Sequence, residues 1–185
     1  MASDFHIRSA AQAIQHGAVI AYPTEAVYGL GCDPQNPFAV ERILSIKRRP
    51  VEKGLILLAS SVAQLEPYLN WTDEQRTQAE AIWANAHQAT TLLIQASEYT
   101  PEWVRGQFQK VAVRVTQHAV ANALCEQVGH PIISTSANRA GQPALEHAWQ
   151  IQLHLKDEVE AVLSGVCPAQ NPSTIMDLES RQVVR

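Results

Sequence analysis

Several features are scarce in this sequence, and each scarcity argues against a class of protein. The 185 residues contain three cysteines and no Cys-x-x-Cys pair, so neither a disulfide scaffold nor a cysteine-rich zinc site is indicated. No apolar run approaches the roughly 18 residues that span a bilayer, and the N-terminal segment carries charge early, unlike a signal peptide. There is no internal repeat and no low-complexity tract. We therefore expect one cytoplasmic domain, residues 1–185, with reduced thiols.

Charge and the familiar catalytic motifs are also sparse. The 14 basic residues are outnumbered by 18 acidic ones, which gives a formal net charge of −4 and argues against a charge-driven nucleic-acid binder, although a local basic face stays open. The sequence contains no Gly-x-x-x-x-Gly-Lys-[Ser/Thr] loop, no Gly-x-Ser-x-Gly and no His-Glu-x-x-His. A P-loop nucleotide site, a serine hydrolase of that type and a zinc hydrolase are therefore not indicated.

Helical and strand patterns alternate along much of the chain. This alternation favours an α/β fold, a sheet with helices packed on it. Helices are expected after Ser3 or Asp4, after Asn36-Pro37 (with Phe38, Ile43 and Leu44 on one face), after the capping-box pair Thr72 and Gln75, in "HAVANALCEQVG" and in "EHAWQIQLHL". Strands are expected at Ala18–Tyr22 and in "GLILLAS", "ATTLLIQA", "KVAVRVT", "PIIS", "EAVLSG", "STIMDL" and "QVVR".

Small polar residues follow two of the expected strands. Thr24 comes directly after "AVIAYP", and "PIISTSANRAG" ends its strand in Ser134, Thr135, Ser136 and Asn138. One interpretation is ordinary capping and turn formation, with Gly29 and Gly31 supplying positive φ angles in a loop. The other is a ligand cradle, because ligands of open α/β sheets gather at the carboxyl ends of strands.

Two basic features leave a similar choice open. Lys47, Arg48, Arg49 and Lys53 lie within the segment "KRRPVEKG", which is either a solvated surface run or a clamp for polyphosphate. Arg114 lies inside the alternating strand "VAVRVT". It must reach solvent, a carboxylate or a phosphate, because burial without a partner would be too costly. "NPSTIMD" repeats the hydroxyl theme with Ser173 and Thr174.

Five segments in order resemble the YrdC-like family of threonylcarbamoyl-AMP synthases. They are "YPTEAVYGLGCD", "KRRPVEKGLILLA", "AVRVT", "STSANRAG" and "PSTIMD", and together they span about 18–177. The resemblance implies a single-domain, twisted, open mixed sheet with helices packed on it and a concave ligand cleft. It also implies synthesis of L-threonylcarbamoyl adenylate from L-threonine, bicarbonate or CO2, and ATP, with release of pyrophosphate. The product would serve a downstream transferase complex that makes N6-threonylcarbamoyladenosine in tRNA.

The resemblance also implies residue roles. Thr24 and Arg114 would hold threonine and its carbamate, with Arg114 pairing to the carboxylate. ATP and its phosphates would be held by Lys47, Arg49, Ser134, Ser136, Asn138, Ser173 and Thr174. A Mg²⁺ ion would bridge the phosphates, with ATP supplying many of its ligands. No residue is required as a catalytic base, and no protein metal ligand is indicated.

The sequence departs from the family pattern in one region. Where the family carries a Trp-Pro-Gly-Pro turn before a threonine, this chain reads "ANAHQATTLL" and retains Thr91. Two alternatives to the synthase stay open at this point. One is a module that binds double-stranded RNA or tRNA through the basic cluster, and the other is a paralogue with a changed substrate.

Overall fold

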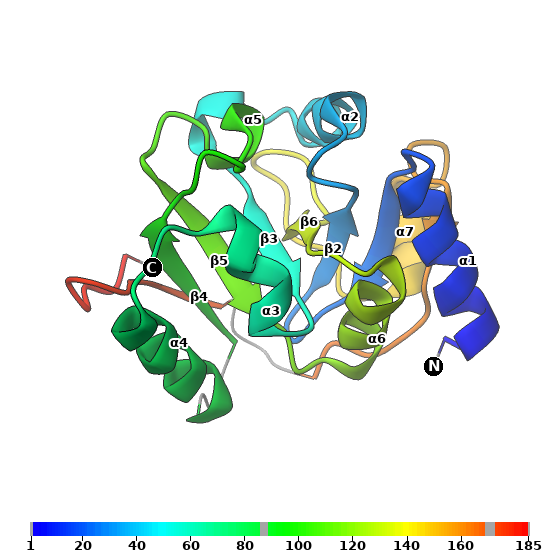
Figure 1. The fold of residues 1–185 in the computed structure, drawn as a ribbon. Coiled ribbons are helices and arrows are strands. Elements are labelled where there is room, and N and C mark those ends of the chain that lie inside the picture. The colour runs from blue at the N-terminus through cyan, green and yellow to red at the C-terminus, as the bar shows by residue number, and fades with distance from the viewer. Residues whose placement is uncertain (1, 86–88, 169–172, 185) are drawn as a thin grey trace.

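One mixed sheet organises the protein, which we describe from a computed structural model over residues 2–85, 89–168 and 173–184. Within these residues the strand order is β7-β1-β2-β6-β3-β5-β4-β8 (Figure 1). The strands are β1 Ile20–Pro23, β2 Tyr28–Gly31, β3 Ile56–Ala59, β4 Thr90–Gln95, β5 Lys110–Val115, β6 Ile132–Ser136, β7 Ala161–Val162 and β8 Thr174–Asp177. The helices are α1 Asp4–Gln15, α2 Pro37–Lys47, α3 Val62–Leu65, α4 Asp73–Asn85, α5 Glu102–Arg105, α6 Ala119–Val128 and α7 Ala148–His154, with 3-10 turns η1 Val51–Lys53 and η2 Glu66–Tyr68.

The strand directions bring two of the polar strand ends to one edge. β1 pairs antiparallel with β2, and β2 pairs antiparallel with β6, so β1 and β6 run in the same direction. β6 pairs antiparallel with β3, whereas β3 and β5 are parallel. The carboxyl ends of β1 and β6 therefore lie at the same edge, separated only by the start of β2. The expected α/β mixed sheet is confirmed.

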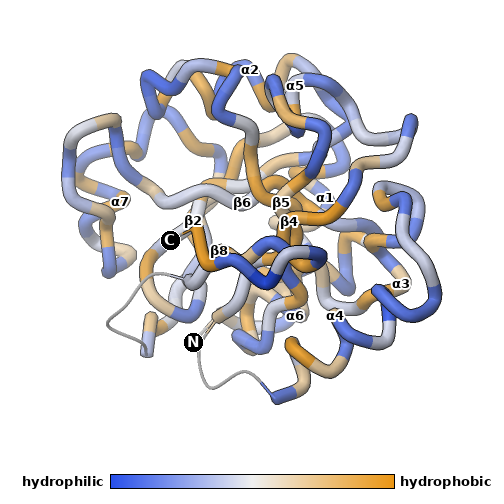
Figure 2. Tube along the Cα trace, turned by 90° about the vertical axis from the view of Figure 1, so that its left-hand side faces the viewer, coloured by the Kyte–Doolittle hydropathy of each residue, from blue (hydrophilic) through white to orange (hydrophobic). Residues whose placement is uncertain are grey.

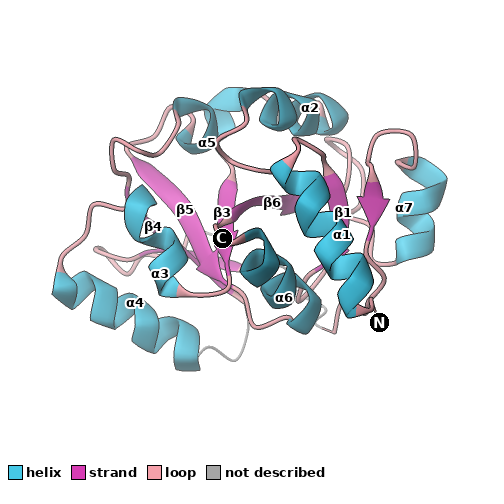
Figure 3. Cartoon of the chain, turned by 45° about the vertical axis from the view of Figure 1, so that its right-hand side comes forward, coloured by secondary structure: helices cyan, strands magenta, loops and turns pink. Residues whose placement is uncertain are grey.

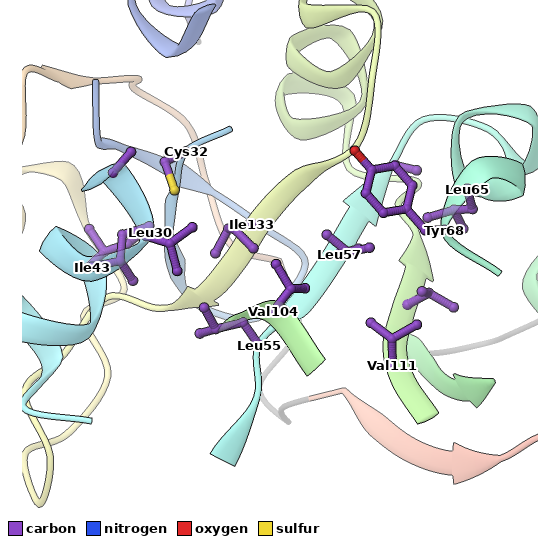
Figure 4. Packing of buried hydrophobic residues seen from close by; sticks show 14 of the residues in the cluster. Leu30, Cys32, Ile43, Leu55, Leu57, Leu65, Tyr68, Val104, Val111 and Ile133 are labelled. Atoms are coloured by element: carbon purple, nitrogen blue, oxygen red, sulfur yellow. The ribbon is translucent and has the colours of Figure 1, made fainter. Parts of the chain in front are cut away.

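Two hydrophobic clusters lie on opposite faces of the sheet. Along β1, Ala21 belongs to one cluster while Ile20 and Tyr22 belong to the other, because successive side chains of a strand point to opposite faces. The larger cluster packs under α2, α4 and α5 and contains the residues drawn in Figure 4. The smaller one lies under α1 and α6, which lie side by side in Figure 3.

Hydropathy follows this layering. Orange, hydrophobic segments gather around the labels β4 and β5 at the centre of the tube in Figure 2, and blue segments lie around the outside. Among the described residues, no helix is both long enough and apolar enough to cross a membrane.

Local capping signals predicted the helix ends well. The Asn36 side chain accepts a hydrogen bond from the Ala39 N–H at 3.1 Å, which caps α2. Thr72 and Gln75 form the expected reciprocal capping box before α4, with distances of 2.9 and 3.2 Å. Gly129 ends α6 with φ +85°, as glycine C-caps do.

Three expectations from the sequence are wrong. Gly29 and Gly31 do not supply positive φ in a loop but lie within strand β2. Phe38 does not share the buried face of α2, since it is 76% exposed while Ile43 is fully buried; five helical residues turn through about 140° beyond a full circle. "QVVR" forms no strand over its described residues, where Val183 makes only an isolated bridge to Met176.

Candidate active site

A cleft of about 790 Å³ opens on one face of the sheet. Its floor includes Ile56 of β3, Ala112 of β5 and Ser134 of β6, which are direct neighbours across the sheet. The same face carries Leu58 and Ile132, and there it is covered by α1 and α6. The cleft therefore exists because this helix pair covers only part of the face, and its volume is in the range of small-molecule sites.

The lining of the cleft is basic and rich in hydroxyl groups. Among the described residues that line it there is no Asp or Glu. The basic residues are Arg49, Lys53, Arg105, Lys110 and Arg114, and the hydroxyl-bearing residues other than Tyr28 are Thr24, Ser134, Thr135, Ser136 and Ser173. Part of this positive charge is compensated from outside the lining, because Lys110 pairs with Asp177 at 2.7 Å and Arg105 with Glu102 at 3.2 Å. The N–H and O–H groups of the lining can donate to phosphate or carboxylate oxygens.

Arg114 is the deepest of these cations. Arg114 is only 7% exposed, and its Nη2 lies 3.5 Å from Oε2 of Glu25. Glu25 belongs to the turn between β1 and β2. The sequence left solvent, carboxylate and phosphate as possible partners of Arg114; the protein supplies a carboxylate. Burial by itself raises the pKa of Glu25, but Arg114 and the hydrogen bonds from Thr116 and Gln117 outweigh it, so the pKa is lowered and Glu25 is charged at neutral pH.

Thr24 and Ser134 meet across the start of β2. The Thr24 hydroxyl donates to the Val27 carbonyl at 2.7 Å, which closes the turn after β1. A Cβ added at Gly29 would lie 3.3 Å from Cγ2 of Thr24 and from Cζ of Tyr22, and 3.5 Å, an ordinary contact distance, from Oγ of Ser134. A side chain at this position would therefore crowd Thr24 and Tyr22, and with glycine there both Thr24 and Ser134 line the cleft.

Lys47 lies behind the cleft wall, where it anchors the end of β6. It is 5% exposed, and its ammonium group donates to the carbonyl oxygen of Ser136, to Oγ of Ser136 at 3.4 Å, and to the carbonyl and Oδ1 of Asn138 at 3.0 and 3.1 Å. Ser136 in turn donates to Oδ1 of Asn138 at 2.6 Å. Burial, assisted by the nearby charge of Arg49, lowers the pKa of Lys47 to about 8.

Arg49 comes two residues after α2 and contacts Gly54, just before β3, whose start lies beside the end of β6. Its guanidinium donates to the Gly54 carbonyl at 2.8 Å and to the Lys53 carbonyl at 3.1 Å, which fixes it against η1. Only glycine fits this tight turn without strain. Gly54 has φ +60°, and a Cβ there would lie 2.8 Å from the Arg105 carbonyl oxygen. The basic segment is therefore folded onto the cleft and is not a fully solvated run.

Ser173 closes the far side of the cleft beside β4. It is 7% exposed, and its Oγ accepts a hydrogen bond from the buried Thr91 hydroxyl at 3.2 Å. Thr174, the next residue, is not among the lining residues, whereas Ile175 is. The replaced family turn falls largely on residues 86–88, outside the described residues, but Thr91 itself is in β4.

The structure thus brings most of the predicted site residues to one cleft. Thr24, Arg49, Arg114, Ser134, Ser136 and Ser173 line it. Lys47 and Asn138 support Ser136 from behind, and Thr174 lies outside the lining. Sequence reasoning did not single out Arg105 and Lys110 or the partner role of Glu25. No local signal marks them, because their position depends on which strands and loops become neighbours.

Solved structures with known names share this fold. E. coli YciO superposes with a TM-score of 0.87 at 26% identity, covering 99% of this chain and 89% of that chain. P. abyssi Sua5, in a crystal structure with L-threonine, superposes with a TM-score of 0.86 at 33% identity, covering 95% of this chain. This chain spans about half of the Sua5 chain, with 51% covered. The protein therefore has an α/β domain like those of YciO and Sua5.

Sequence comparison identifies the family. The Sua5_yciO_yrdC family model, described as telomere recombination, matches residues 12–185. The threonylcarbamoyl-AMP synthase of Vibrio cholerae is 47% identical over 184 residues, which cover 97% of this chain and 96% of that protein. The chain therefore belongs to the Sua5/YciO/YrdC family, and the resemblance to the YrdC-like family is confirmed.

Proposed function

We propose that this chain is an L-threonylcarbamoyl-adenylate synthase that uses L-threonine, bicarbonate or CO2, and ATP. The observation that carries the proposal is the buried Arg114 in a cleft whose described lining has five basic residues and no acidic one. Relatives of nearly equal length, such as the Vibrio cholerae protein, are named threonylcarbamoyl-AMP synthases. The Sua5 structure with L-threonine supports the amino-acid substrate.

The amino acid would bind at the Arg114 end of the cleft. Arg114 would hold the carboxylate, because a guanidinium matches a carboxylate with paired N–H donors. Thr24 would lie beside the same substrate. The amine of threonine would then lose a proton and add to CO2, which forms a carbamate whose oxygen is the nucleophile of the next step.

ATP would bind along the wall formed by η1 and the end of β6. Arg49 would hold phosphate oxygens, and Ser134, Ser136 and Ser173 would donate hydroxyl groups to the nucleotide. Lys47 and Asn138 would contribute by holding Ser136, and Lys47 by its positive charge behind the phosphates. Thr174 would contribute indirectly, because it begins β8 and thereby holds the preceding residue, Ser173, in the cleft.

The reaction itself is an in-line displacement. A carbamate oxygen would attack the α-phosphorus, the bond to the bridging oxygen would break, and pyrophosphate would leave with its electron pair. Positioning and neutralisation of charge supply most of the catalysis in such reactions, which agrees with a cleft of fixed donors.

A magnesium ion would enter with ATP. The described cleft lining offers hydroxyl and carbonyl oxygens but no carboxylate, so this chain's Ser134 and Ser136 could contribute at most neutral ligands and the phosphates would provide the rest. When bound, the ion would neutralise phosphate charge.

We also propose a cytoplasmic location, supported by three free cysteines, and delivery of the product to a transferase complex that modifies tRNA.

The decisive experiment measures pyrophosphate release from ATP with bicarbonate, in the presence and absence of L-threonine. Release that depends on threonine, and is much weaker with L-serine, is the expected result. ATP binding without release would favour a paralogue with a changed substrate. If ATP is not bound, and double-stranded RNA is bound with a steep salt dependence, the synthase proposal is wrong.

A further inference from the structure

The guanidinium of Arg114 is held near a charge but makes no hydrogen bond within the described part of the chain. Its Nη2 lies 3.5 Å from Oε2 of Glu25, which is longer than the roughly 2.7–2.9 Å of a charge-assisted hydrogen bond. Nε of Arg114 and Oε2 of Glu25 are both buried without a hydrogen-bond partner. The ion pair therefore compensates the charge of Arg114, while the terminal Nη groups, which are not among the buried atoms, remain available to a ligand.

Glu25 itself is fixed firmly. Its Oε1 accepts a 2.6 Å hydrogen bond from the Thr116 hydroxyl and a 3.3 Å bond from the N–H of Gln117. Thr116 is 2% exposed, its N–H donates to the Ala59 carbonyl at 2.9 Å, and its hydroxyl accepts from the N–H of His118 at 3.2 Å. The carboxylate is thus anchored to the chain two residues beyond Arg114.

The contrast between the two oxygens of Glu25 is informative. One oxygen is saturated by fixed donors, and the other faces the guanidinium without binding it closely. A pair that served stability alone would gain most from a short, bidentate contact, since unsatisfied buried donors and acceptors are costly. An arginine held by charge but with open donors is instead arranged for a second anion.

We propose that Glu25 is a positioning residue for substrate binding: it orients and electrically compensates Arg114, so that the guanidinium presents its N–H groups to the carboxylate of the amino-acid substrate. Thr116 is the anchor of this arrangement. The inference rests on the proposed function, and it adds a residue that does not line the cleft. The lowered pKa of Glu25 is consistent with it.

The test uses Glu25→Gln, which preserves size and removes the charge. The KM for L-threonine is expected to rise by about tenfold or more, because an uncompensated buried arginine is displaced or hydrated. The KM for ATP and the kcat at saturating threonine should change by no more than about twofold. Glu25→Asp keeps the charge on a shorter side chain and should lie between wild type and Glu25→Gln. In titration calorimetry, the Kd for L-threonine should rise in the same order, from wild type to Glu25→Asp to Glu25→Gln.

Glu80→Gln is the matched control, because Glu80 forms an exposed ion pair with Arg76 at 3.2 Å on α4 and should leave both KM values unchanged. If Glu25→Gln does not fold, Thr116→Val decides the question, since it keeps Glu25 and removes the hydroxyl that anchors it, together with the acceptor of the His118 N–H. A several-fold rise in the threonine KM alone supports the inference in either variant. An unchanged threonine KM, or equal losses for threonine and ATP, overturns it while the synthase stands. A wild-type protein that neither binds threonine nor releases pyrophosphate overturns both.

Discussion

Replacing Lys47 by methionine separates a structural lysine from a functional one. The residue is 5% exposed, and burial together with the charge of Arg49 lowers the pKa of its ammonium group to about 8 from 10.5. This difference corresponds to roughly 3 kcal/mol by which folding disfavours the charged form. Methionine has a similar length and carries no charge, so the substitution removes that cost.

The substitution also removes hydrogen bonds. The ammonium group donates to the carbonyl oxygens of Ser136 and Asn138 and to Oδ1 of Asn138. The Ser136 carbonyl keeps the Asn138 N–H as a donor, and Oδ1 of Asn138 keeps the Ser136 hydroxyl. Only the Asn138 carbonyl loses its donor, which costs about 1–3 kcal/mol. The two effects are of similar size and opposite sign. Lys47→Met should therefore change the free energy of unfolding at pH 7 by less than about 2 kcal/mol, as measured by urea denaturation.

Activity should respond very differently. If the positive charge of Lys47 acts on the phosphates, Lys47→Met raises the KM for ATP by about tenfold or more. In the wild type, kcat/KM for ATP should be flat below pH 8 and fall above it, as the free enzyme loses the Lys47 proton. The variant should lack this fall. The exposed Lys156→Met serves as the control and should match the wild type.

The contribution of Lys47 to stability depends on pH in the opposite direction to its contribution to activity. Between pH 8 and 10.5 the unfolded chain binds the Lys47 proton more tightly than the native state does, so this residue makes native stability rise with pH through that window. The unfolding free energy of the wild type minus that of Lys47→Met should therefore increase from pH 8 to pH 10. A large loss of stability in the variant with an unchanged KM for ATP would refute the reasoning and make Lys47 purely structural.

Three further predictions follow from the site and its support. Arg114→Ala should raise the KM for L-threonine by about 100-fold, far more than that for ATP, and equal losses in steady-state kinetics would contradict the carboxylate role. Gly31→Ala should destabilise the protein by about 1–3 kcal/mol in urea denaturation, because a Cβ there would lie 2.7 Å from Cε1 of Tyr22 and 2.8 Å from the Ile133 carbonyl oxygen; an unchanged midpoint would show that β2 can shift. Ala112→Leu, in the cleft floor, should weaken binding of both substrates in calorimetry while the melting temperature stays within a few degrees, and full activity would mean that the substrates bind elsewhere.

Local signals were reliable wherever a short stretch of chain decides its own structure. Asn36 capped α2 and the Thr72–Gln75 pair capped α4, because a cap needs only residues three apart. The buried strands followed from runs of branched apolar residues. The ordered set of five motifs identified the family, because each motif is retained at its place in the chain.

What failed at the sequence level depended on partners distant in the chain. Gly31 suggested a turn, yet the reason for glycine there is the ring of Tyr22 and the backbone of β6. Phe38 fits an apolar helix face by type but is exposed, since the face of α2 that packs is chosen by the sheet beneath it.

The sequence by itself determined the alternation of helices and strands, the family, and the residue types that gather at strand ends. Only the tertiary structure decided that α1 and α6 leave part of one sheet face open as a cleft. It also decided that Glu25 faces Arg114 across 89 positions of chain and that Lys47 lies behind Ser136. The physical reason is that burial and charge compensation depend on distances in space, which a linear pattern does not contain until the strands are paired.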